Sequence, residues 1–582
     1  MQLQPAHTTD LHRNDPNGPV YYKGVYHLFY QFNPTAAIWG DMHWGHAVST
    51  DGMLTWKELP IALSPDQPYD VGGVFSGSIT LLPTINGETI PVVSYTCVDA
   101  QQTQMQCLAV PEDASDPLLH RWVKPDVNPI LPKGPLGTPP TFFRDPSTAW
   151  QTHTGSSWLT AIGAVPAGVP STVLYAAEQS GFLAGQWAYN GTLFTFPPAS
   201  QWADMYECPD FFPLPSPGAA AALGQLCPAA QGWDGQVWAA KISALPGRRD
   251  YVALGCFNAG TLKWEQRGNV TLYDGGVWYA SKTFDANGQR VLWGWVTETD
   301  AQEDWVTRGW AGVQSLPLLL SIHPVLAVVA SQPLPALSAL TSPLASRPAP
   351  QGRNSTMCAS CKRQFRLQAH LNTGKATANA SNILSALAMA EGSGARVCMG
   401  TWGGSGCSDG PEVLLSTLPP VSAEQGVRIT SGGFIDVPAP SPAPQSCAAV
   451  CTGEYGASCV AWTHAGDSCS LFSFVGGTQA CASCTSGIVG GAIVVVGPAG
   501  AESSVFSAVG TIGALAHASC LTHGTVDVDI WYDRSILQVF AAQGTVRLTS
   551  RWYAQGNASV VVSGAGASGS VQLAAVGSIW AA

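Results

Sequence analysis

Three short acidic motifs lie far apart in the sequence: Asn14-Asp15-Pro16-Asn17-Gly18, Arg144-Asp145-Pro146 and Tyr206-Glu207-Cys208-Pro209. A pair of positioned carboxylates is the minimum machinery for cleaving a glycosidic bond, one as the nucleophile and one as the proton donor. A third carboxylate could hold the sugar hydroxyls. Each motif alone could be structural, because Asn-Asp-Pro-Asn-Gly is ordinary turn chemistry. Their order and flanking residues together favour a shared site.

The elements that must position these residues are short strands. Between about residues 14 and 320, β-rich segments alternate with turns, and almost no segment keeps a helical period. The aromatic stretch 21–30 breaks at Lys23-Gly24, which predicts a hairpin. Only 11% of the residues are charged, against roughly 25% in average domains. We therefore expect an all-β chain, and a closed propeller suits such a run because it leaves few exposed strand edges.

Composition excludes two classes of partner. The net charge of −12 argues against nucleic acid, whose binding proteins carry a basic face. No apolar run reaches the roughly 20 residues that span a bilayer. The nearest, Leu316 to Ala330, is interrupted by His323 and Pro324 and is interpreted as buried strand at a domain junction.

The cysteines and glycosylation sequons indicate a secretory route. The chain carries 16 Cys and sequons at Asn190, Asn269, Asn354, Asn379 and Asn557. Disulfides persist in oxidising compartments, so an extracellular or vacuolar location is expected although no apolar leader precedes Asn14. Two Cys-x-x-Cys pairs, at 358–361 and 481–484, could instead hold zinc, but disulfides are favoured in a chain with sequons.

The residues around the motifs resemble one known family. With the acidic motifs, the resemblance to glycoside hydrolase family 32, and most to its plant invertase branch, rests on these segments: 31–34 (Gln-Phe-Asn-Pro), 44–49 (Trp-Gly-His-Ala-Val-Ser), 73–78 (Gly-Val-Phe-Ser-Gly-Ser), 279–284 (Tyr-Ala-Ser-Lys-Thr-Phe), 309–317 (Gly-Trp-Ala-Gly-Val-Gln-Ser-Leu-Pro) and 532–540 (Tyr-Asp-Arg-Ser-Ile-Leu-Gln-Val-Phe). It covers about residues 10–320 and 520–582, with a poorly matched middle.

This resemblance implies a five-bladed β-propeller followed by a C-terminal β-sandwich, with the site in the propeller funnel. It implies that Asp15 is the nucleophile, Glu207 the general acid/base and Asp145 the residue that grips fructose hydroxyls. The retaining mechanism requires carboxyl groups roughly 5–5.5 Å apart. Arg144 is expected to keep Asp145 ionised and oriented, with a plain salt bridge between the two as the alternative. The implied substrate contacts are Asn14, Gln31, Trp39, Phe75, Ser76, Arg144 and Asn258.

No metal and no cofactor is expected. His43 and His46 flank Trp44-Gly45, but in a strand they would point to opposite faces, which disfavours a metal pair. Trp44 itself is interpreted as a core residue rather than a sugar contact.

Three positions depart from the family pattern. His12 stands where invertases usually have an aromatic residue, and Phe75 replaces a frequent Trp. Asn258 stands where invertases tend to place an Asp that engages the glucose half of sucrose. We therefore expect the residues that recognise fructose to be intact. A preference for sucrose over other fructosides does not follow from the sequence.

We expect a catalytic propeller over 1–325, a Pro/Ala/Ser-rich linker over 326–356 and a sandwich over 357–582. Six cysteines at 447–484 predict a small disulfide-rich insert over 445–491, similar to PAN/apple modules. Such a module could bind a cell-wall glycan or could be a disulfide-stabilised decoration.

The expected function is a retaining glycosidase that releases fructose from sucrose or fructans through a fructosyl-enzyme intermediate. A fructan exohydrolase or a fructosyltransferase of the same family is the first alternative, because acceptor choice depends on the shape of the funnel. A catalytically silent glycan-binding protein is the second alternative.

Overall fold

The computed structural model describes residues 11–348 with short gaps, chiefly at 152–156, 197–202, 215–226, 228–232 and 324–327. Beyond residue 348 it describes mainly the residues of β-strands, and for many of these only the backbone. The chain divides into two compact units, the first containing residues 1–273 and 277–339 and the second containing residues 340–577. The cysteines at 447, 451 and 459 of the expected insert, and every sequon except Asn190, lie outside the described residues.

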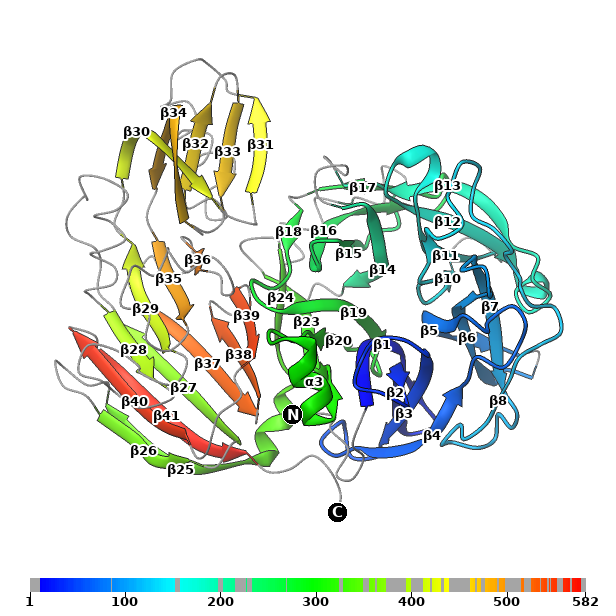
Figure 1. Ribbon diagram of the computed structural model, residues 1–582, viewed down its shortest axis with the longest axis horizontal. Helices are drawn as coiled ribbons and strands as arrows, with labels where there is room; N and C mark the ends of the chain where they lie inside the picture. Colours follow the sequence, from blue (N-terminus) through cyan, green and yellow to red (C-terminus); the bar gives the residue numbers. More distant parts are fainter. Residues whose placement is uncertain are drawn as a thin grey trace. The chain divides into compact units, whose positions relative to one another are not determined.

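The described strands of the first unit form five sheets (Figure 1). The first has the order β21 (Trp310–Ala311), β1 (Leu11–Tyr22), β2 (Val25–Asn33), β3 (His43–Ser49) and β4 (Lys57–Leu63). The second has the order β5 (Gly73–Pro83), β6 (Thr89–Val98), β7 (Gln104–Pro111) and β8 (Trp122–Val123). The third has the order β10 (Trp150–Gln151), β11 (Ser157–Ala164), β12 (Ser171–Glu178) and β13 (Ala188–Phe194), with β9 (Phe143–Arg144) beside β11.

The fourth sheet has the order β14 (Met205–Leu214), β15 (Val237–Leu245), β16 (Arg249–Asn258) and β17 (Lys263–Gln266), with β18 (Thr271–Leu272) beside β16. The fifth has the order β19 (Trp278–Asp285), β20 (Arg290–Val296), β23 (Leu318–Ile322) and β24 (Val329–Pro333), with β22 (Val313–Gln314) beside β20. Figure 1 shows the five sheets following one another around a ring. Because β21 pairs with β1, the end of this unit joins its beginning.

The hydrophobic core lies between neighbouring sheets. Trp44 and Phe29 of the first sheet pack in one cluster with Val93 and Tyr95 of the second. Phe194 of the third sheet packs with residues of the fourth in the same way. Large aromatic residues therefore fill the space between these neighbouring sheets. The interpretation of Trp44 as a core residue is confirmed, since its side chain is fully buried.

The second unit is also β-rich. One sheet contains β25 (Thr341–Pro348), β41 (Ser568–Val576), β27 (Gln364–Asn372), β37 (Thr525–Asp533), β38 (Ile536–Ala541) and β39 (Val546–Arg551). Another contains β26 (Ser355–Cys361), β40 (Ala558–Ala565), β28 (Gly394–Cys398), β29 (Glu412–Leu418), β35 (Gly491–Gly497) and β36 (Ala514–His517). A third contains β30 (Val421–Thr430), β34 (Gly477–Ile488), β32 (Ala461–Ala465), β33 (Ser468–Phe472) and β31 (Phe434–Pro438).

The all-β prediction is confirmed for the part of the chain that the structure describes. Its helical structure consists of α3 (Gln302–Arg308) and the short 3-10 turns η1 (Pro166–Gly168), η2 (Gln179–Gly181) and η4 (Pro335–Leu340). None of these helices could cross a membrane. The stretch expected as a linker, 326–356, contains β24, which pairs with β23 and so continues the fifth sheet.

Candidate active site

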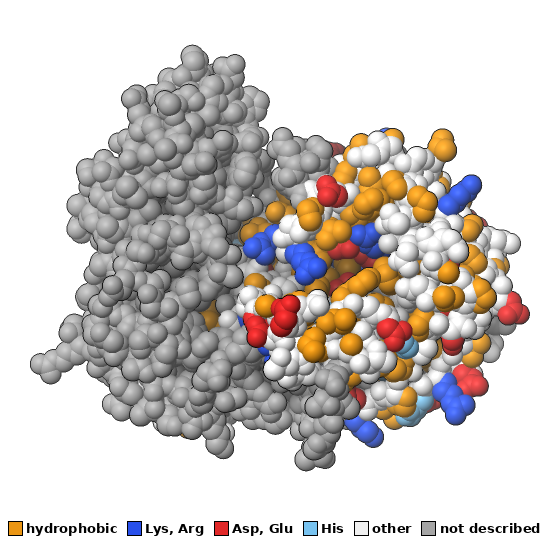
Figure 2. Space-filling model, viewed as in Figure 1, with side chains coloured by type: hydrophobic (Ala, Val, Ile, Leu, Met, Phe, Trp, Pro, Cys, Tyr) orange, Lys and Arg blue, Asp and Glu red, His pale blue; other side chains and the backbone are white. Residues whose placement is uncertain are grey.

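The three acidic motifs come together from three different sheets. Asp15 lies on β1, Asp145 directly follows β9, and Glu207 lies on β14. Figure 2 shows a hollow in this face of the first unit, with acidic side chains inside it and hydrophobic side chains around it. The contacts described below link the three carboxylates through Cys208 and Arg144.

Bulges interrupt four of the strands that reach the site: β1, β5, β14 and β19. On β1, two residues, Asn14 and Asp15, stand opposite one residue of β2. The same two-against-one pairing occurs on β5 at Phe75 and Ser76, on β14 at 208–209, and on β19 at 280–281. A bulge interrupts the alternation of a strand and redirects a side chain. Four of the five sheets therefore break their regular pairing where they reach the site.

Asp15 is held by neutral donors. Asn14 donates from Nδ2 to Oδ1 of Asp15 at 3.0 Å, and Ser76 donates from Oγ to Oδ2 at 2.8 Å. Burial and the nearby Glu207 carboxylate raise the pKa of Asp15, while the hydrogen bonds from Ser76 and Asn14 lower it. The two bonds therefore favour the charged form that a nucleophile requires, against the effect of burial.

Asp145 adopts a left-handed backbone conformation, with a φ of 67°. Its backbone N–H donates to Oγ1 of Thr96 at 2.8 Å, and its Oδ2 accepts the N–H of Cys208 at 2.9 Å. Burial raises the pKa of Asp145; Arg144 opposes this change, while Glu207 and Asp15 add to it. A non-glycine residue in this region is strained and must be held by its surroundings.

Arg144 pairs with Glu207. Its Nε and Nη2 donate to Oε1 of Glu207 at 3.0 and 2.8 Å, and its Nη1 donates to Gln104 and to the Thr141 carbonyl. Tyr279 of β19 donates from its hydroxyl to the other oxygen, Oε2. The expectation that Arg144 orients Asp145 therefore needs correction: its charge acts on Asp145, but its hydrogen bonds go to Glu207, Gln104 and the Thr141 carbonyl.

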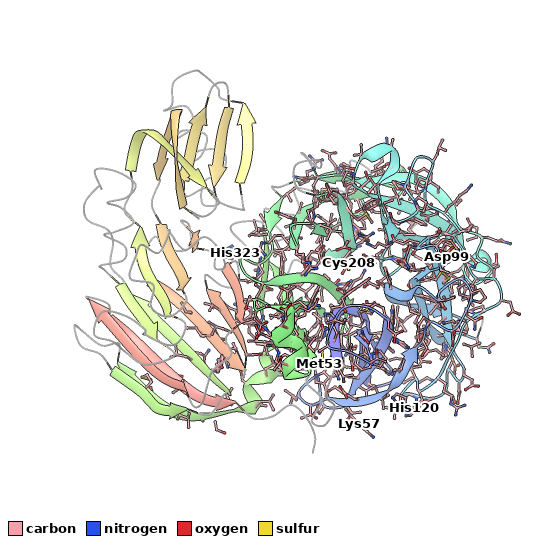
Figure 3. All side chains as sticks on the ribbon, in the orientation of Figure 1. Met53, Lys57, Asp99, His120, Cys208 and His323 are labelled. Carbon is pink, nitrogen blue, oxygen red and sulfur yellow. A yellow bond between two sulfur atoms is a disulfide. The ribbon has the colours of Figure 1, made fainter. Side chains whose placement is uncertain are left out.

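Cys208 is a central residue that the sequence analysis did not single out. Figure 3 places it near the middle of the first unit. The thiol is buried outside any disulfide, and Sγ lies 3.6 Å from Oδ2 of Asp15 and 3.7 Å from Oδ2 of Asp145. Burial and the two carboxylates raise its pKa well above the usual value, so the thiol stays neutral. Its place directly after Glu207 is the only signal that the sequence offers.

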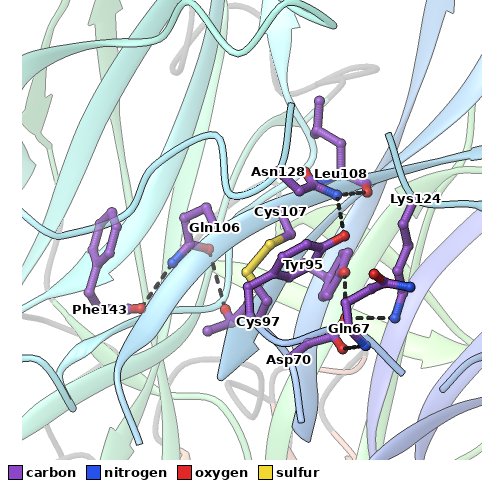
Figure 4. The surroundings of a disulfide bond; sticks show 12 residues. Gln67, Asp70, Tyr95, Cys97, Gln106, Cys107, Leu108, Lys124, Asn128 and Phe143 are labelled. Atoms are coloured by element: carbon purple, nitrogen blue, oxygen red, sulfur yellow. Dashed lines mark hydrogen bonds and ion pairs between the residues drawn. A yellow bond between two sulfur atoms is a disulfide. The ribbon is translucent and has the colours of Figure 1, made fainter. Parts of the chain in front are cut away.

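The second sheet clamps the Arg144-Asp145 segment. Gln106 donates from Nε2 to the Phe143 carbonyl at 2.9 Å (Figure 4). Gln104 accepts the Phe143 N–H at 3.0 Å. The hairpin that carries both glutamines is cross-linked by the Cys97–Cys107 disulfide. The clamp consists of side chains on β7, which no motif in the sequence identifies.

The expected sugar contacts divide into buried and exposed groups. Asn14, Gln31 and Ser76 are buried, and Gln31 donates from Nε2 to the Val74 carbonyl at 3.0 Å. Trp39 is 56% exposed and meets Phe75 edge to face at 5.6 Å between ring centres. An aromatic pair of one exposed and one half-buried ring beside a polar cluster is suited to packing against a sugar ring.

Residues 6–333 match the model of the glycosyl hydrolases family 32 N-terminal domain. The chain belongs to glycosyl hydrolase family 32. It is 44% identical over 320 residues to beta-fructofuranosidase 1 of Zea mays, covering 52% of this chain and 46% of the relative. It is 39% identical over 312 residues to sucrose:sucrose 1-fructosyltransferase of Festuca arundinacea, covering 52% and 45%. The chain thus spans about half the length of the curated relatives it matches.

The fold of this family 32 chain is shared with a solved structure. Fructan 1-exohydrolase IIa from Cichorium intybus aligns with a TM-score of 0.68 and 23% identity, covering 99% of this chain and 96% of that chain. At this identity the likeness concerns the fold alone.

In this family 32 chain, His12 lies beside Trp295, with 6.2 Å between the ring centres. Arg248 lies over the same indole, with its Cζ 5.6 Å from the ring centre. Burial lowers the pKa of His12 to about 4, although Glu298 opposes the change, so the imidazole is neutral near pH 7. The position where invertases usually have an aromatic residue therefore holds a buried, neutral imidazole, which packs against Trp295.

Asn258 does not lie with the other expected contacts. Glu207 pairs with Ser243, and Ser243 pairs with Asp250 of β16. Asn258 follows Asp250 by eight residues on the same strand, roughly 26 Å further at the usual rise per residue. There its Oδ1 accepts the N–H groups of Gly260 and Thr261 at 3.0 and 2.9 Å. Strand register therefore argues against a substrate contact by Asn258, because β16 carries this residue to the far end of the sheet.

Proposed function

We propose that the chain is a retaining β-fructofuranosidase that cleaves terminal β-D-fructofuranosides of sucrose or fructans. The observation that supports this most directly is the convergence of Asp15, Asp145 and Glu207 from three sheets, linked by Cys208 and Arg144. In family 32 these three motifs carry the reaction, and all three carboxylates are present here.

Each carboxylate has a proposed role. Asp15 attacks the anomeric carbon of fructose and forms the fructosyl-enzyme. Glu207 protonates the departing oxygen. In the second step, as a carboxylate, it takes a proton from the water that attacks the anomeric carbon and releases the carboxylate of Asp15. Asp145 accepts hydrogen bonds from fructose hydroxyls and stabilises the positive charge that develops on the ring. Asn14, Gln31, Ser76 and Arg144 surround the fructose, while Trp39 and Phe75 form the apolar wall.

The finer features of the fold belong to the same proposal. The ring of five sheets, with cores between neighbours, supports a five-bladed propeller. The β-rich second unit supports a sandwich over 357–582, with a cysteine-rich insert over 445–491. The buried Cys97–Cys107 disulfide, a second one between Cys227 and Cys256, and the exposed sequon residue Asn190 support folding in an oxidising secretory compartment.

One experiment tests the reaction and its alternatives. The full chain is incubated separately with sucrose, inulin and levan, and the products are separated and quantified. Free fructose in amounts equal to the bonds cleaved supports hydrolysis. Longer oligosaccharides formed from sucrose would favour transfer, the activity named for the Festuca arundinacea relative. Binding without turnover on every substrate would overturn the proposal in favour of a glycan-binding protein.

A further inference from the structure

Two lysines lie buried directly behind the carboxylates. Lys241 of β15 and Lys282 of β19 are 2% and 1% exposed. Lysine is almost never fully buried unless its charge is paired, because removing an ammonium group from water is costly. Neither lysine is used by the proposed reaction, so their position requires another explanation.

Both ammonium groups donate to carbonyl oxygens next to the acidic residues. Lys282 Nζ lies 3.1 Å from the Pro209 carbonyl and 3.5 Å from the Pro146 carbonyl. Lys241 Nζ lies 3.0 Å from the Cys208 carbonyl and 2.5 Å from the Ser281 carbonyl. Pro146 directly follows Asp145, while Cys208 and Pro209 directly follow Glu207. The lysines therefore contact the backbone of both acidic motifs.

The bulges explain why these carbonyls need partners. Residues 208–209 form the bulge of β14, and Ser281 lies in the bulge of β19. A bulge interrupts the ladder, and a buried carbonyl that loses its ladder partner must be satisfied elsewhere. Lys241 joins the two bulges, and Lys282 joins the bulge of β14 to the segment after Asp145.

The charges around the lysines also favour this arrangement. Burial lowers the pKa of Lys282, while Asp210, Cys208 and Asp145 raise it and Lys241 lowers it. Lys241 lies 3.7 Å from Asp250, and Arg290 faces Asp210 from β20. The two ammonium groups thus lie between the structural carboxylates Asp210 and Asp250 on one side and the acidic site on the other.

We propose that Lys241 and Lys282 are positioning residues of the site, which hold from behind the carbonyl groups that follow Asp145 and Glu207. They fix the spacing of the two carboxylates and supply positive charge to a crowded acidic cluster. This inference rests on the proposed function, since the spacing matters for the reaction that the carboxylates perform.

The test compares Lys282→Met, which removes both the charge and the donor, with Lys282→Gln, which keeps a donor. Lys124→Met is the matched control, because Lys124 is a buried lysine that pairs with Asp66 and Asp70 away from the site. With the substrate that the wild-type chain cleaves best, Lys282→Met should lower kcat by about 10²-fold, the cost of a misplacement of about 1 Å. KM should change little, and Lys282→Gln should recover part of kcat.

The pH profile separates positioning from general stability. A nearby cation lowers the pKa of a carboxylate, so losing it raises that pKa. The acidic limb of kcat/KM should therefore move to higher pH, by on the order of one unit, in both Lys282 variants. Lys124→Met should lower the melting temperature and leave the limb in place.

Two results would overturn the inference. One is a folded Lys282 variant with the kcat and pH profile of Lys124→Met, which would show that the lysine only stabilises the fold. If Lys282→Met fails to fold, Lys282→Gln and Lys241→Gln are judged by the same criterion. The other is an inactive wild-type chain, which would refute the proposed function itself and this inference with it.

Discussion

Asp15 and Glu207 both belong to bulged inner strands, yet their surroundings differ in charge. Asp15 accepts hydrogen bonds from the neutral groups of Asn14 and Ser76. Glu207 accepts two from the guanidinium of Arg144 and one from the hydroxyl of Tyr279. The first and second sheets thus supply neutral donors to Asp15, whereas the third and fifth sheets supply a cation and a phenol to Glu207.

This difference shows where the positive charge of the site is used. Arg144, the cation in direct contact with the described acidic cluster, is already bound to Glu207, while Asp15 and Asp145 are held by neutral donors. A fructosyl ring that develops positive charge would place a cation in direct contact with Asp15 and Asp145, which the lysines behind the site do not do. On the proposed mechanism, these two carboxylates therefore interact more strongly with the transition state than with the neutral substrate, which is the condition for catalysis.

Removing Asp15 should have the largest effect. Asp15→Ala eliminates the nucleophile, so kcat should fall by on the order of 10⁴-fold or more, as for other essential catalytic groups. Fructose release is measured at saturating substrate, with circular dichroism as the check on folding. Asp113→Asn, at an exposed carboxylate, is the control and should leave kcat unchanged. Substantial activity in folded Asp15→Ala would show that the β1 carboxylate is not the nucleophile.

Replacing Glu207 should have a smaller effect that depends on the leaving group. Glu207→Gln keeps a group that can still contact Arg144 and Tyr279 but loses general acid catalysis, which contributes about 10²–10⁴-fold. The loss should be largest on sucrose and smaller on fructosyl fluoride, whose leaving group needs less protonation. Equal losses on the two substrates would contradict the proton-donor role and place Glu207 among the binding groups.

Asp145 lies between the two regions, and its ionisation should affect stability. Because its pKa is raised in the folded state by burial, the folded chain favours the protonated form. Its contribution to stability is present below the unfolded pKa of about 3.8 and is lost as pH rises through the folded value. Asp145→Asn should therefore raise the melting temperature at pH 8, by about 1–3 °C, and the gain should shrink toward pH 4.

The matched control for this stability experiment is Asp51→Asn. Burial raises the pKa of Asp51, but hydrogen bonds from Thr55 and Ser49 outweigh this and lower it. Its replacement should therefore lower the melting temperature at pH 8. Burial lowers the pKa values of His12, His27 and His46, so protonating them as the pH falls destabilises the folded chain. This effect is the same in every variant and does not change the comparison between them. If Asp145→Asn lowered the melting temperature at pH 8, as is expected for Asp51→Asn, the predicted stabilisation would be contradicted.

Sequence reasoning found the residues that lie inside motifs and missed those that depend on register between strands. Asp15, Asp145 and Glu207 could be singled out because the three motifs and their flanking residues together resemble one family, although each motif alone could be structural. The partner of Arg144 could not, because Glu207 reaches it from another sheet. Lys241 has no motif at all and reaches the site only because β15 pairs with β14 across a bulge. The all-β class followed from turns and short strands, whereas the contacts between sheets did not.

Replacing Asn258 should have the smallest effect. This variant tests whether the substrate site reaches along the fourth sheet from Glu207 to Asn258. On the same strand, Asp250 lies level with Glu207 and accepts hydrogen bonds from Trp278 and Ser281, while Asn258 closes a turn at the other end. Asn258→Ala should change kcat and KM for sucrose by less than about twofold. It should cost about 0.5–1.5 kcal/mol of stability through lost turn bonds. A marked rise in KM for sucrose, with KM for fructans unchanged, would mean that sucrose contacts this end of the sheet. The site would then extend further than the strand register indicates.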